Sequence, residues 1–275
     1  MAQNGFLPLA LADWRATRDT LHRYTRVLGA VRAALTPKQK HWWHISLRVA
    51  PDGLTTTEIP AGKSRFTLRL DLTAHRLVIQ TGHTQPAHIP LGGQSSAKLS
   101  AQIMTVLEHL GIKPDIDKAK VGDATPAHYD RVAVERFWRA LQRIDATVNR
   151  FHEKLGANTS PVQLWPHHFD LAMNWFSGRK VPGADPADEE AFEEQMNFGF
   201  STGDDSIPDP YFYITAYPLP AELVKTLLPP DASWHTQGWT GAILPYASLT
   251  TAERPEEKLL GFLQQVHEAG SRLMK

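Results

Sequence analysis

Apolar residues recur along the chain with two different periods, and these periods predict its helices and strands. Over residues 9–35 and again over 131–155 they return every three or four positions, which is the spacing of a helix with one buried face. A shorter stretch at 95–110 has the same spacing, and Ser95 or Ser96 is predicted as its N-cap, a position that serine favours. A last helix is predicted to begin at Pro255.

Between these helices, apolar and polar residues alternate, as they do in half-buried strands. The alternation is regular from Phe66 to Leu72, and Pro51-Asp52-Gly53 is typical of a tight turn. Further strands are predicted at 43–49, 54–59, 77–79, 162–175, 196–200, 211–217 and 239–249. Strands joined by short turns pair antiparallel. The predicted fold class is therefore α+β, with helix, antiparallel strands and helix in each half.

The two halves also share an order of residues. Trp14 and Leu21 return as Phe137 and Ile144, 123 residues later (137 − 14 = 123). The segment His41-Trp42-Trp43-His44-Ile45-Ser46-Leu47 returns at a similar distance as Leu164-Trp165-Pro166-His167-His168-Phe169-Asp170-Leu171. These echoes predict one internally duplicated domain. Its first half would span residues 1–112, a linker 113–128, and its second half 129–275 with an inserted loop at 178–192.

Composition narrows the classes of function. Lysine plus arginine number 29, as do aspartate plus glutamate, so neither nucleic acid nor an anionic membrane is expected as the main partner. No apolar stretch approaches the roughly 18 residues of a membrane span, and no signal sequence precedes the first helix, so a cytoplasmic location is expected. The absence of cysteine excludes disulfides, thiolate metal sites and thiol nucleophiles.

The predicted strand at 43–49 carries the first candidate site. Alternation places Trp43, Ile45 and Leu47 on the core face, and Trp42, His44 and Arg48 on the opposite face. In the second half, the same alternation turns Leu171 inward, and His168 and Asp170 away from the core. If the halves pack about a pseudo-twofold axis, His44, His168 and Asp170 converge.

Two histidines and one carboxylate are the ligands of non-haem iron and of some zinc sites. The sequence therefore predicts a divalent metal, iron or zinc, held by His44, His168 and Asp170. The His-x-Asp spacing adds nothing by itself, because it also occurs at residues 128–130. The alternative is that these histidines are structural or lie on the surface. His41 and His235, each close to a tryptophan, are further candidates.

Residues 199–203, Gly-Phe-Ser-Thr-Gly, match the Gly-x-Ser-x-Gly pattern of hydrolases. A nucleophile elbow needs a strand before the serine and a helix after it. Asp204 and a proline-rich segment follow Ser201, so a hairpin turn is predicted instead. Residues that would complete a triad with Ser201 are Asp205 or Asp231 and His235 or His267. The chain has no glycine-rich dinucleotide loop, phosphate-binding loop or His-Glu-x-x-His helix.

Several separated motifs resemble one known family: His41-Trp42-Trp43-His44, Gly53-Leu54-Thr55-Thr56, Phe169-Asp170-Leu171-Ala172, Phe176-Ser177-Gly178-Arg179, Tyr217-Pro218 and Leu244-Pro245-Tyr246. The chain resembles, over nearly its whole length, a bacterial family known only as domain of unknown function 5996. The resemblance implies a soluble bacterial protein. It brings no activity and no catalytic residues.

The favoured hypothesis is a metal-dependent enzyme with a small-molecule pocket between the halves. Trp42 and Trp165 would form its walls, Arg48 would hold an anionic group, and Tyr213 would also line it. The alternative is a non-catalytic module that binds a small molecule or another protein through the same residues. A serine hydrolase that uses Ser201 is a minor alternative. The oligomeric state is left open.

Overall fold

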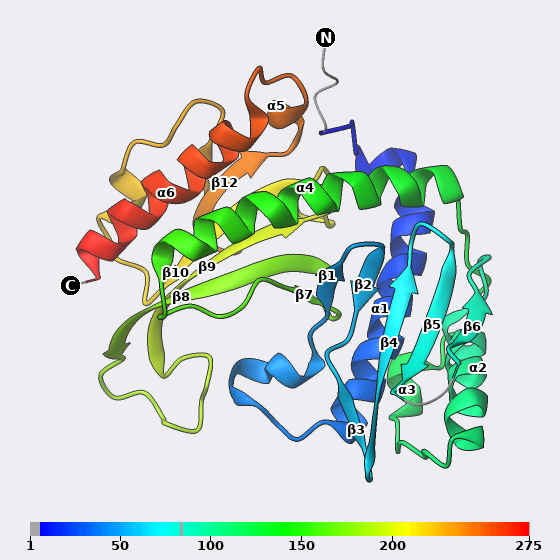
Figure 1. Ribbon diagram of the computed structural model, residues 1–275. Helices are drawn as coiled ribbons and strands as arrows, with labels where there is room; N and C mark the ends of the chain where they lie inside the picture. The colour runs from blue at the N-terminus through cyan, green and yellow to red at the C-terminus, as the bar shows by residue number, and fades with distance from the viewer. Residues whose placement is uncertain (1–5, 83–84, 275) are drawn as a thin grey trace. The chain divides into compact units, whose positions relative to one another are not determined.

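The computed structural model describes residues 6–82 and 85–274 and divides the chain into two compact units (Figure 1). The α1 unit comprises Trp14–Trp138 and Gln163–Phe169. The α6 unit comprises Met1–Asp13, Arg139–Val162 and Asp170–Lys275. Each unit joins helices to an antiparallel sheet, so the α+β class predicted from the sequence is confirmed. The internal duplication stays a prediction.

The helices of the α1 unit follow the predicted apolar spacing. Helix α1 (Arg15–Leu35) begins after a 3-10 turn, η1 (Leu11–Asp13), and buries Tyr24, Leu28 and Val31 along one face. The hydroxyl of Ser95 accepts the backbone N–H of Lys98 and caps α2 (Ser96–His109), so of the two predicted N-cap residues, Ser95 and Ser96, it is the first that forms the cap. A one-turn helix, α3 (Lys118–Val121), lies within the predicted linker.

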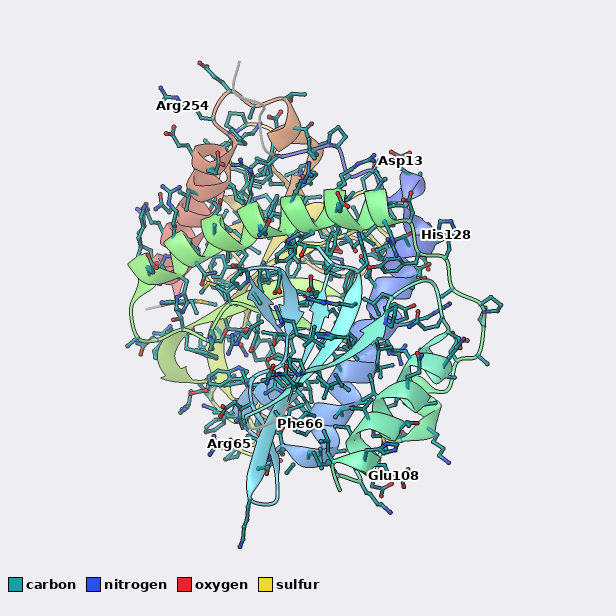
Figure 2. All side chains as sticks on the ribbon, turned by 45° about the vertical axis from the view of Figure 1, so that its right-hand side comes forward. Asp13, Arg65, Phe66, Glu108, His128 and Arg254 are labelled. Carbon is teal, nitrogen blue, oxygen red and sulfur yellow. The ribbon has the colours of Figure 1, made fainter. Side chains whose placement is uncertain are left out.

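The sheet of the α1 unit has the strand order β1-β2-β4-β5-β6, and β3 pairs with β4. Its strands are β1 (Arg48–Ala50), β2 (Gly53–Thr55), β3 (Ile59–Ala61), β4 (Ser64–Asp71), β5 (Arg76–Thr81) and β6 (Ala87–Pro90). Alternation along β4 is confirmed from Phe66 to Leu70: Phe66, Leu68 and Leu70 are buried, whereas Thr67 and Arg69 are partly exposed. Asp71, which the alternation places on the polar face, is buried, and Arg65, just before this stretch, is exposed (Figure 2). A further short strand of this unit, β7 (Gln163–Trp165), forms a bridge to Leu47.

The sheet of the α6 unit has the strand order β11-β12-β10-β9-β8. These strands are β8 (Asp170–Lys180), β9 (Glu193–Ser201), β10 (Tyr211–Tyr217), β11 (Ser233–His235) and β12 (Gly241–Pro245). The other elements are η3 (Leu223–Lys225), α5 (Ala247–Thr250), α6 (Pro255–Leu273) and the end of α4 (Arg131–Leu155). Helices α4 and α6 lie on one side of this sheet (Figure 1). Phe151 of α4 packs against Phe198 of β9 on that side, at 5.0 Å between ring centroids.

The predicted strand at 43–49 is wrong over its first half. Residues Lys40–Ile45 form a 3-10 segment, η2, and β1 begins only at Arg48. His41 and Trp42 have φ values of 53° and 60°, in the left-handed region that an extended strand cannot include. The alternation that assigned Trp42 and His44 to one strand face therefore does not apply to them.

The predicted strand at 162–175 is also interrupted. A turn separates β7 from β8, so His168 lies in that turn rather than in a strand. Pro166 has no N–H to give to a sheet, and Phe169 has a φ of 58°. Asp170 is the first residue of β8. Within the predicted loop at 178–192, β8 continues to Lys180, and β9 starts at Glu193.

No helix in the described part of the chain is long and apolar enough to cross a lipid bilayer.

We expect Gly53→Ala to lower the free energy of unfolding by about 1–3 kcal/mol, because β2 lies too close to β4 for a side chain. A methyl group at residue 53 would lie 1.8 Å from the carbonyl oxygen of Leu70. The matched variant Gly261→Ala, in α6, meets no atom within 4 Å and should stabilise by roughly 0.5–1 kcal/mol. Urea unfolding followed by circular dichroism measures both. Equal effects of the two variants would contradict the described packing at β2.

Candidate functional site

The segment between α1 and β1 has a strained backbone. Its two consecutive left-handed residues, His41 and Trp42, carry large side chains, and each costs about 1–2 kcal/mol relative to an ordinary conformation. Strain of this kind persists only where the surrounding structure holds it, and it concentrates at functional sites. The kink at η2 is therefore the first place to search for a site.

The kink displays an aromatic and basic surface. Trp42 is 46% exposed. The Lys38 ammonium lies 5.2 Å from the centroid of the Trp42 ring, and the His44 ring stacks on that tryptophan at 5.5 Å. His44 is itself buried, and its Nδ1 accepts the backbone N–H of Gln39 at 3.3 Å. One face of the indole is thus covered by the histidine ring, while part of the indole stays exposed to solvent.

Arg32, in the last turn of α1, supports the same kink from inside the α1 unit. Its side chain is only 1% exposed. One Nη donates to the backbone carbonyl of Ser46, and the other donates to Thr57 Oγ1 at 2.7 Å. Its Nε is buried without a hydrogen-bond partner. Within residues 6–82 and 85–274, no carboxylate forms an ion pair with this guanidinium.

The Arg32 guanidinium stays charged despite this burial. Loss of solvent lowers its pKa to about 10, and the positive charge of Arg48 adds to the effect. A group with that pKa is almost fully protonated at neutral pH. Burying a charge without an opposite charge is costly, commonly by several kcal/mol. Arg32 is therefore a buried cation that lacks a counter-ion in the described chain.

A second buried donor lies close to this point in the hydrogen-bond network. The Ser46 hydroxyl donates to Gln163 Oε1 at 2.6 Å, and Leu47 and Leu164 exchange two backbone hydrogen bonds of 2.9 Å. Gln163 is completely buried, yet its Nε2 has no acceptor. Ser46 thus connects two residues, Arg32 and Gln163, that each carry an unused N–H donor. Such donors favour a ligand that brings acceptor oxygens.

The stretch of sequence that leads to the kink and contains it is rich in basic residues. Residues 20–51 contain no aspartate or glutamate and carry six lysines and arginines: Arg23, Arg26, Arg32, Lys38, Lys40 and Arg48. The whole-chain count hides this segment, because residues 181–224 carry ten acidic residues and no lysine, arginine or histidine. A count of charge by segment would have revealed it from the sequence.

The residues predicted as a site are divided between the two units. Trp42, His44, Arg48, Trp165 and His168 belong to the α1 unit, whereas Asp170 and Tyr213 belong to the α6 unit. Within the α1 unit, Trp42 contacts His44, and the rings of His167 and His168 lie 4.3 Å apart. In the α6 unit, the Tyr213 hydroxyl donates to Asp170. No group of three histidine, aspartate or glutamate side chains in the described residues is placed to hold a metal ion.

Ser201 does not lie in a nucleophile elbow. It ends β9, and its hydroxyl accepts the backbone N–H of Gly203 at 3.1 Å. Residues 202–210 contain no helix and lead directly into β10, which pairs antiparallel with β9. The hairpin connection predicted from the proline-rich sequence is therefore what the chain forms.

Two histidines beside β7 are neutral rather than part of the positive surface. His22 stacks on Phe169 with centroids 5.6 Å apart, and its Nε2 lies 3.2 Å from the carbonyl oxygen of His167. Burial lowers the pKa of His22. Burial, with repulsion from His168 and His22, lowers the pKa of His167 to about 4. At neutral pH both rings are uncharged.

We expect acid to destabilise the α1 unit through these rings. Above pH 6.5 the folded and unfolded chains both carry neutral histidines; between pH 6.5 and about 4 the unfolded chain binds protons that folded His167 does not. Stability should therefore be complete above pH 6.5 and fall as the pH drops toward 4. His167→Asn should reduce this fall, as seen in urea midpoints at pH 7.5 and 5. His88→Asn, at an exposed position of β6, is the control; the same reduction there would contradict the assignment to His167.

No curated protein and no solved structure shows significant similarity to this chain. One family model, for a family of unknown function, matches residues 6–275.

Proposed function

Since the chain belongs to the DUF5996 family, which has no known function, we propose a function from its own side chains: it binds a small anionic molecule at the kink between α1 and β1. One observation carries the proposal. The Arg32 guanidinium is 1% exposed and charged, and it has no carboxylate partner among the described residues.

A carboxylate or phosphate group suits this environment. Guanidinium groups bind such anions through paired, charge-assisted hydrogen bonds, and the Nε of Arg32 still has a proton to donate. Arg48, in β1, supplies a second positive charge and is the residue that the sequence predicted for an anionic group. The lysines and arginines of residues 20–51, apart from Arg23, which forms an ion pair with Asp123, would raise the local concentration of anions before they bind.

Trp42 gives the proposed ligand an apolar part. The Trp42 indole is partly exposed, and its ring stacks on that of His44. The exposed part offers contact area to a ring or a short hydrocarbon chain. Trp165, the other wall predicted from the sequence, is partly exposed and packs edge-on against His167 at 5.7 Å. We propose that Trp42 contacts the ligand and leave Trp165 as a secondary candidate.

Titration calorimetry with phosphate, pyrophosphate and citrate tests the proposal. At least one of these anions should bind, with an uncharged sugar as the negative probe. Arg48→Gln should weaken that binding by about tenfold or more, since a hydrogen bond to a charged group contributes about 1.5–3 kcal/mol. Arg32→Lys keeps the charge but loses the planar fork, and it should weaken binding as well.

The control is Arg65→Gln, because Arg65 is exposed on the β3–β4 hairpin and forms an ion pair with Glu58 (Figure 2). This change removes one positive charge from the same unit but leaves the kink intact. Equal weakening by Arg48→Gln and Arg65→Gln would show a general charge effect and refute the site. Failure of all three anions to bind wild-type protein at roughly 10 mM would refute the function.

The metal-dependent enzyme stays a separate prediction that elemental analysis can decide. Untagged protein would contain near-stoichiometric iron or zinc, and His44→Ala or His168→Ala would remove it. Protein whose metal content does not respond to either change would end the ligand assignment of these histidines.

A further inference from the structure

Three aromatic side chains lie together on one face of the sheet of the α6 unit. Tyr211 and Tyr213 occupy alternate positions of β10, and Trp239 comes from the segment that precedes β12. The ring centroids of Tyr211 and Tyr213 are 6.2 Å apart. The ring centroid of Trp239 lies 6.4 Å from that of Tyr211 and 6.3 Å from that of Tyr213. The three rings thus form a nearly equilateral triangle, the aromatic triad.

Two glycines make room for this triad. Gly199 of β9 is opposite Tyr213 in the strand register, and an added Cβ there would lie 2.3 Å from the Cζ of that tyrosine. At Gly241 of β12, an added Cβ would lie 2.6 Å from an indole carbon of Trp239. Both rings therefore lie directly on the sheet backbone, where any larger residue would displace them.

The surroundings of the triad are acidic rather than apolar. The Tyr213 hydroxyl donates to Asp170, and the Tyr211 hydroxyl donates to Asp204 at 3.0 Å. Although burial by itself would raise it, the pKa of Asp204 is lowered by hydrogen bonds from Ser206, Ile207 and Tyr211, so this carboxylate is ionised at neutral pH. Both tyrosines belong to the segment 181–224, with its ten acidic residues and no basic one.

The opposite face of the same strands packs in the hydrophobic core. The face that carries the triad has polar and acidic groups instead, so the triad is not part of that core. Phe198, Phe200 and Phe212 are buried on the core side. On the side of the triad, the Oδ1 of Asn197 is buried and accepts no hydrogen bond. Asn197 pairs with Thr215, two residues along β10 from Tyr213. The groups gathered on this face are therefore carboxylate and amide acceptors beside the three rings, with the His235 ring 4.5 Å from that of Trp239.

We propose that the aromatic triad, with Asp170 and Asp204, binds a small organic cation such as a methylated ammonium group. Cations bind over aromatic ring faces within about 6 Å of a centroid, and cages of two or three rings recognise methylated ammonium groups. With centroids 6.2–6.4 Å apart, a cation held near the centre of the triangle would lie within about 6 Å of all three centroids. The ionised carboxylate of Asp204 adds attraction for a cation and disfavours anions. This site lies in the α6 unit and is independent of the anion site proposed at Arg32.

The test compares choline with 3,3-dimethylbutan-1-ol, which has the same shape but no charge, by calorimetry on the full chain. We expect choline to bind and the neutral alcohol to bind at least about tenfold more weakly. Trp239→Leu should weaken choline binding by about 5- to 30-fold, whereas Trp239→Phe, which keeps a ring, should weaken it less. Asp204→Asn should weaken it without removing any ring.

Tyr217→Leu is the matched control, because Tyr217 lies on the same strand, is 44% exposed and is outside the triad. The Tyr217→Leu protein should bind choline with the same affinity as the wild type. Circular dichroism checks that each variant is folded, and if Trp239→Leu is not, the Asp204→Asn result decides. Equal affinity for choline and the neutral alcohol, no binding of choline at roughly 10 mM, or unchanged binding in both variants would overturn the proposal.

Discussion

The hydrogen bond from the Arg32 guanidinium to the Ser46 carbonyl is the constraint on which the candidate site depends. It fixes the end of the kink, and the adjacent residue Leu47 pairs with Leu164 of β7. The bond joins α1 to the end of the strained turn, and separate hydrogen bonds from Ser46 and Leu47 join that turn to β7, more than one hundred residues away in sequence. The left-handed conformations of His41 and Trp42 persist only where the surrounding structure holds them in this way. The same buried guanidinium leaves the charge that the proposed anion would neutralise.

Charge is separated along a chain that is neutral as a whole. One block without acids, residues 20–51, lies in the α1 unit and includes the kink, and one block without bases, residues 181–224, lies in the α6 unit and includes Tyr211 and Tyr213 of the aromatic triad. The total charge of the chain therefore says little about its ligands, whereas the sign of the charge in each block indicates which ligands that block favours. The two proposals follow from this separation: acceptor-rich anions suit the first block, and organic cations suit the second.

Much of the fold could be predicted, because periodicity reports burial directly. The long helices α1 and α4 and the alternating strand β4 appear where apolar spacing places them, and Ser95 caps α2 as its position indicates. The buried position of Arg32 could also have been predicted from the sequence. It is four residues after Leu28 and three before Leu35, so it lies on the buried stripe of α1, where a charge needs a reason.

The sequence by itself determined the helices, the alternating strands and the two charge blocks, since these depend on the order of neighbouring residues. Only the tertiary structure decided that residues 40–45 and 166–169 are not strands, because His41, Trp42 and Phe169 have positive φ values there, which an extended strand does not include. It also decided which side chains meet. Trp239 reaches Tyr213 because β12 pairs with β10, and Gln163 reaches Ser46 because β7 bridges to Leu47. Such pairings depend on long-range hydrogen bonds, which no local pattern encodes.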